Sequence, residues 1–217
     1  MLQPIKSLLH EPAQQRYFLK LLLIYLAIAL PFKTLDLLPG FANIRPNSAL
    51  IPIYGYLFGP IGALINGMGN FFYDILTGSF SKGSPAGAAA NFIVPLFMCF
   101  VWKHCVGERF CLKTLRHLYW YTLIAAMAAV LKAIIITPAV LYFYPEVSGP
   151  SFFQIVVITE ITFYLMPGAA ILIWLQCFYG FKGYEPAESL KTEKRVQRKS
   201  VGPLTHKVQK QTWTVQK

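Results

Sequence analysis

The chain alternates between long apolar segments and short polar connections. Four segments are long enough for a helix rising about 1.5 Å per residue to cross about 30 Å of hydrocarbon. They run from Tyr17 to Leu38, from Pro85 to Trp102, from Leu118 to Tyr144 and from Phe152 to Phe178. A fifth apolar stretch begins at Ser48 and ends at Gly78. The pattern predicts an all-α protein whose helices lie in a membrane.

The fifth stretch is interrupted in its middle by Gly59-Pro60. Glycine favours the end of a helix and proline favours the first position of the next one. We therefore expect a short helix from Ser48 to Phe58 and a longer helix from Pro60 to Thr77. With the other four segments, the prediction is a bundle of six membrane-spanning helices.

The positions of the basic residues favour the same count. Lysine and arginine concentrate before Tyr17, between Lys103 and Arg116, and after Tyr179, where nine of the chain's twenty lie. Such regions are retained on the cytoplasmic side of a membrane. Six spans place all three regions there and leave three loops, 39–47, 78–84 and 145–151, outside. We expect a multi-pass protein of the inner (plasma) membrane with both termini cytoplasmic.

The composition agrees with a membrane protein. Hydrophobic residues make up 55% of the 217 and charged residues only 13%, which exceeds what a soluble core of this size needs. The net charge of +11 would suit nucleic acid binding, but its distribution is typical of a cytoplasmic membrane surface, so we expect no nucleic acid partner. The predicted organisation is a cytoplasmic segment over 1–16, with no signal peptide, a transmembrane domain over 17–178 and a disordered basic tail over 179–217 that meets lipid headgroups.

Three polar residues follow one another at four-residue spacing in the predicted third helix. Asn66, Asn70 and Asp74 would share one helix face. A polar group in lipid costs free energy unless it meets a partner. The stripe therefore points to the bundle interior or to a ligand cavity.

Two further charges, Lys132 and Glu160, fall inside predicted spans. They could form a structural ion pair, since charges within membranes usually pair, and Glu160 could also line an outward-facing cavity for a polar solute. Lys132 is expected to lie deeper and to hold Glu160 in place. The predicted substrate-binding residues are Asn66, Asn70, Asp74 and Glu160, with Arg45 and Asn47 from the first outer loop closing over them.

No motif of an enzyme or of a metal site is recognisable. The chain has no His-Glu-x-x-His, Gly-x-Ser-x-Gly, phosphate-binding glycine loop or Cys-x-x-Cys. His104, Cys105, Cys111 and His117 match no zinc spacing. We expect no enzymatic activity, no metal ion, no cofactor and no disulfide.

Three short motifs between Arg45 and Asp74 resemble a run in a known family. They are Arg45-Pro46-x-x-Ala49, Gly55-x-x-Phe58-Gly59-Pro60-x-Gly62-Ala63 and Gly69-Asn70-x-x-x-Asp74. The run resembles the substrate-binding membrane subunits, called S components, of energy-coupling-factor vitamin transporters. The likeness is close over about thirty residues, and the predicted six-helix layout extends it loosely to residues 17–178.

The resemblance implies a small six-helix protein that binds a micronutrient from outside with high affinity. It also implies two kinds of partner, a transmembrane coupling subunit and a pair of ATPases. The chain departs from the family in its first helix, where Ala27 is followed four residues later by Pro31 rather than by a small residue.

Two other functions remain open from the sequence. A stand-alone carrier would use Lys132 with Glu160 or Asp74 as a proton or ion relay. A membrane receptor or assembly protein would recruit a cytoplasmic partner through the basic tail. Internal inverted repeats would favour the carrier and helical periodicity in the tail would favour the receptor, and neither is evident.

Overall fold

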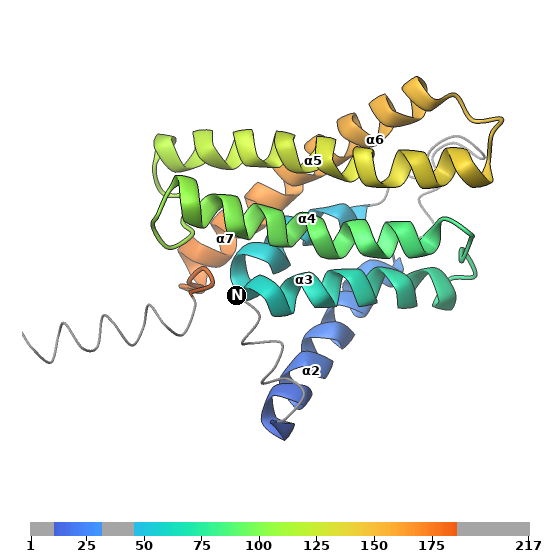
Figure 1. The fold of residues 1–217 in the computed structure, drawn as a ribbon. Helices are drawn as coiled ribbons and strands as arrows, with labels where there is room; N and C mark the ends of the chain where they lie inside the picture. The colour runs from blue at the N-terminus through green and yellow to red at the C-terminus, as the bar shows by residue number, and fades with distance from the viewer. Residues whose placement is uncertain (1–10, 32–45, 186–217) are drawn as a thin grey trace, which may run out of the picture. The chain divides into compact units, whose positions relative to one another are not determined.

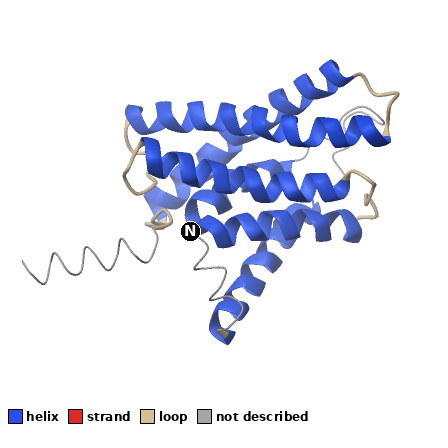
Figure 2. Ribbon diagram, viewed as in Figure 1, coloured by secondary structure: helices blue, strands red, loops and turns tan. Residues whose placement is uncertain are grey.

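The computed structural model describes residues 11–31 and 46–185, and these fold into helices joined by turns (Figure 2). α2 covers Pro12–Ala29, and α3 covers Leu50–Leu76 after the 3₁₀ turn η2 (Pro46–Ala49). α4 covers Ser84–Cys105 and α5 covers Leu115–Phe143. α6 (Gly149–Phe163) continues through the π-helical turn η3 (Tyr164–Gly168) into α7 (Ala169–Phe178). The predicted all-α class is confirmed.

Four helical segments of the described chain are long and apolar enough to cross a membrane. They are Pro46–Leu76, Ser84–Cys105, Leu115–Phe143 and Gly149–Phe178. α2 is not among them, because Gln14, Gln15, Arg16 and Lys20 lower the apolar content of its 18 residues. Residues 32–38 of the predicted first span lie outside the described residues. The fold is compatible with a multi-pass membrane protein.

The predicted count of six helices is not supported. Residues 11–31 and 46–185 form five continuous helical segments, since the helices predicted over 48–58 and 60–77 are joined in α3 without an intervening loop. The prediction treated Gly59-Pro60 as the end of one element. The structure instead accommodates the pair as a sharp break inside one helical segment.

Gly59 supplies that break. Its φ of 57° and ψ of −131° are not helical, and a positive φ is accessible to glycine at little cost. The chain folds back here. Gly62 lies so close to Tyr54 that a Cβ on Gly62 would overlap the Tyr54 carbonyl, whereas Tyr54 and Gly62 would lie about 12 Å apart along a straight helix. We call residues 50–58 the first limb of α3 and residues 60–76 its second limb.

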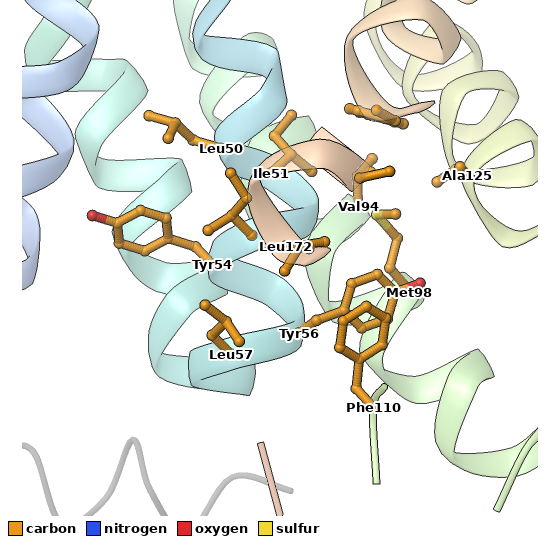
Figure 3. Packing of buried hydrophobic residues seen from close by; sticks show 14 of the residues in the cluster. Leu50, Ile51, Tyr54, Tyr56, Leu57, Val94, Met98, Phe110, Ala125 and Leu172 are labelled. Atoms are coloured by element: carbon orange, nitrogen blue, oxygen red, sulfur yellow. The ribbon is translucent and has the colours of Figure 1, made fainter. Parts of the chain in front are cut away.

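The first limb packs into the apolar core (Figure 3). Ile51 and Tyr56 from this limb are almost fully buried, as are Val94 and Met98 of α4 and Leu172 of α7. α5 contributes Tyr121 and Ile124 together with several alanines at its contact face, including the fully buried Ala125, Ala128 and Ala129. Small residues let helix backbones approach closely, which is the usual source of helix association in lipid.

The second limb of α3, α4 and α5 lie side by side, and α6 packs against α5 and crosses it obliquely (Figure 1). Turns 77–83 and 144–148 lie at one end, which we call the cavity end. Turns 106–114 and 179–184 lie at the other, which we call the basic end because it exposes Arg109, Lys113 and Lys182. This order of neighbours brings α3, α4, α5 and α6 around one space at the cavity end.

The basic end is closed by the segment that follows α7. The Tyr184 backbone N–H donates a hydrogen bond to the Tyr56 carbonyl (2.7 Å), and the Tyr184 ring lies directly against Gly59. Burial raises the pKa of the Tyr184 hydroxyl. The first compact unit of the chain accordingly extends through Tyr184.

Candidate solute-binding site

A cavity of about 420 Å³ lies at the cavity end of the helices. Sites for small molecules usually measure about 300–1,000 Å³. Its lining comes from α2, η2, α3, α4, the α3–α4 turn, α5, the α5–α6 turn and α6, so residues far apart in the sequence meet around it. They are Tyr25, Asn47, Ser48, Ile51, Asn70, Asp74, Ser81, Gly83, Ser84, Gly87, Asn91, Lys132, Ile136, Val140, Tyr144, Phe152, Ile155, Val156, Thr159 and Glu160.

One wall of the cavity is polar. Asn70 and Asp74, each 1% exposed, lie one turn apart on the second limb of α3. Asn47 and Ser48 of η2 and Asn91 of α4 are also buried and line the same space. Folding back at Gly59 creates this wall, because it returns the second limb to the level of η2.

A buried ion pair lies on the side of the cavity formed by α5 and α6. The Lys132 ammonium is 2.6 Å from Glu160 Oε1, and the two residues are 5% and 6% exposed. The Ser48 hydroxyl donates to the same oxygen over 2.9 Å. One carboxylate oxygen therefore joins η2, α5 and α6.

The remaining wall is apolar. Ile136 and Val140 of α5 face the cavity together with Phe152, Ile155 and Val156 of α6. The cavity thus has two chemically distinct sides. A solute that fits it has a polar edge and an apolar body.

Two buried polar atoms of the lining, Asn70 Nδ2 and Asn91 Oδ1, have no hydrogen-bond partner among the described residues. Glu160 differs, because the buried Tyr164 hydroxyl, one helical turn further along, hydrogen-bonds to its carboxylate. Asp74 and Lys132 differ as well, because each is engaged in a further interaction of its own. A buried donor or acceptor left without a partner costs about 1–3 kcal/mol. A ligand that supplies the missing partners would recover this free energy.

The structure brings together most of the residues predicted to bind substrate. Asn47, Asn70, Asp74 and Glu160 line the cavity. Asn66 does not. It lies one turn deeper, where its Nδ2 donates to the Gly62 carbonyl over 3.0 Å. Arg45 lies outside the described residues.

Several lining residues were not among the predicted site residues. Asn91 is the clearest case, and its signal in the sequence is an amide alone within the apolar segment that starts at Pro85. Ser48 and Ser84 carried no signal, because a serine at the start of a helix is usually a cap. Lys132, expected below the site, lines the cavity itself.

The chemistry available here is hydrogen bonding and charge pairing within an apolar enclosure. Within 11–31 and 46–185, no group of three or more His, Cys, Asp or Glu side chains is placed to hold a metal ion. No protein-family model, curated protein or solved structure matches the chain.

Proposed function

We propose that this protein binds a small solute in the cavity between α3, α4, α5 and α6, and that it serves membrane uptake as the substrate-binding subunit of an ATP-driven transporter of the energy-coupling-factor type. The observation that carries the proposal is a solute-sized cavity lined by buried polar groups within helices long enough to span a bilayer.

The free energy needed to bury the polar side chains of this lining supports a binding role. Helix packing alone would be served by apolar side chains, whereas Asn70, Asp74 and Asn91 each need a polar partner when buried. Polar side chains inside membrane helices usually mark a path or a site for a polar ligand. The segment from Arg45 to Asp74 resembles S components. This resemblance is the basis for proposing a transporter of this type, with a coupling subunit and ATPases as partners.

A second candidate is a stand-alone carrier coupled to protons or ions. The buried Lys132–Glu160 pair on the cavity wall favours it, because ionisable side chains inside membrane helices often mark ion pathways in transporters. The two candidates differ in their energy source. The subunit requires ATP hydrolysis by a partner, and the carrier requires an ion gradient.

The test is copurification from native membranes in a mild detergent. Mass spectrometry would identify the proteins that accompany the tagged chain and the small molecules released when it is denatured. We expect a membrane coupling subunit, ATPases and one enriched micronutrient. The Asn70→Ala variant should keep the protein partners and lose the solute. Thr162→Ala, on an exposed face of α6 away from the cavity, should retain both.

Uptake of the identified solute then separates the two candidates. Loss of uptake on ATP depletion, with no effect of a protonophore, supports the subunit. The opposite pattern supports the carrier. Copurification of a cytoplasmic protein without any solute would favour the receptor or assembly protein and overturn the proposal.

A further inference from the structure

We infer that the cavity takes an uncharged solute that presents a carboxamide-type edge, with a hydrogen-bond acceptor and a donor side by side, on a flat apolar body. This inference rests on the proposed solute-binding function and names the chemistry of its ligand. It is carried by the two unpartnered polar atoms of the lining, Asn70 Nδ2 and Asn91 Oδ1, together with the apolar wall formed by α5 and α6.

The unpartnered atoms define what the solute edge must offer. Asn70 Nδ2 is a donor, and it needs an acceptor. Asn91 Oδ1 is an acceptor, and it needs a donor. A primary carboxamide presents a carbonyl oxygen and an N–H group side by side on one edge, so it matches this pair of atoms.

Asn70 and Asn91 lie close enough to serve one small group. A Cβ at Gly87 would be 3.5 Å from Asn70 Nδ2, and Gly87 precedes Asn91 by about one helical turn of α4. The two asparagines therefore lie on facing helices about one turn apart. The carbonyl oxygen and the N–H group of one amide edge can bridge them.

The charges of the described lining favour an uncharged edge. The lining holds two carboxylates, Asp74 and Glu160, and one ammonium, Lys132, so its net charge opposes an anionic solute. Glu160 Oε1 is already taken by Lys132 and Ser48, and Asp74 is engaged in an interaction of its own. A cationic solute would have to displace one of these existing partners. Burial of an uncompensated charge costs far more than burial of an amide.

The opposite wall determines the body of the solute. Ile136, Val140, Phe152, Ile155 and Val156 offer apolar contacts without hydrogen-bonding groups. A planar ring fits between such side chains and can also stack on Phe152. An aromatic carboxamide is therefore the simplest molecule that satisfies both sides.

The inference can be tested with three probes of one shape: benzamide, benzoate and benzylamine. Calorimetry on the full chain in detergent should show saturable binding of benzamide, at least about tenfold tighter than binding of either charged probe. Asn70→Ala and Asn91→Ala should each weaken benzamide binding about tenfold. Gln154→Ala, which removes an exposed amide of α6 outside the lining, should leave it unchanged.

Asn70→Asp provides a second variant of the same shape that lacks the donor, and it should lose benzamide binding even if Asn70→Ala fails to fold. Tighter binding of benzylamine or benzoate, equal binding of all three, binding of none, or unchanged affinity in folded Asn70 and Asn91 variants would each overturn the inference. These outcomes are independent of copurification with ATPases. A solute of another class recovered from native membranes would leave the proposed function standing.

Discussion

Replacing Gly59 with alanine should destabilise the protein by about 2–4 kcal/mol. Backbone strain at φ 57° and ψ −131° accounts for about 1–3 kcal/mol of this. The new Cβ would also push the Tyr184 ring away and weaken the hydrogen bond from Tyr184 to Tyr56, which is worth about 1 kcal/mol. The measurement is the free energy of unfolding from titration with sodium dodecyl sulfate in mixed micelles.

Gly180→Ala is the matched control. Gly180 also has a positive φ of 61°, but a Cβ there meets nothing within 4 Å, so only strain of about 1–2 kcal/mol is expected. The Tyr184→Ala change should cost less in the Gly59→Ala background than in the native chain, because the ring has already moved. A Gly59→Ala variant as stable as the native protein, or with a loss equal to that of Gly180→Ala, would refute the reasoning.

Three further predictions concern the rest of the chain. Lys132→Met should cost about 3–5 kcal/mol because it leaves Glu160 buried without a cation; adding Glu160→Gln should restore much of the loss in the same detergent titration. Truncation after Glu185 should leave the thermal unfolding midpoint unchanged, whereas truncation after Phe178 should lower it through loss of the Tyr184–Tyr56 contact; equal midpoints would contradict this. In a cysteine-free background, Lys82→Cys and Ser148→Cys should react with an impermeant maleimide in intact cells and Lys182→Cys should not, and labelling at 182 would reverse the predicted orientation.

Features encoded by local chemistry were predictable from the sequence. The break at Gly59-Pro60 follows from the conformational preferences of two adjacent residues. The presence of Asn70 and Asp74 on one side of a helix follows from helical periodicity. Both could be read without knowledge of any neighbouring helix.

Features that depend on packing were not predictable in this way. Asn66 shares the stripe, but its amide folds back onto the Gly62 carbonyl, a choice determined by what faces it. Asn91 joins the site because its side of α4 faces the cavity. Tyr184 lies in a polar stretch without apolar periodicity, so its packing against Gly59 had no signature. The helix count failed because a broken helix and two helices have the same sequence pattern.

The position at which α3 begins determines the depth of the cavity. Ser48, just before this helix, bonds to Glu160, whose partner Lys132 lies about 16 Å from the end of α5 at 1.5 Å per residue. The start of this helical segment is therefore itself part of the cavity lining, with Asn47 and Ser48 ahead of Leu50 and Ile51 just after it. Chain length, as well as side-chain chemistry, thus affects the size of the solute that fits, because one extra helical turn ahead of Leu50 would extend this end by about 5 Å.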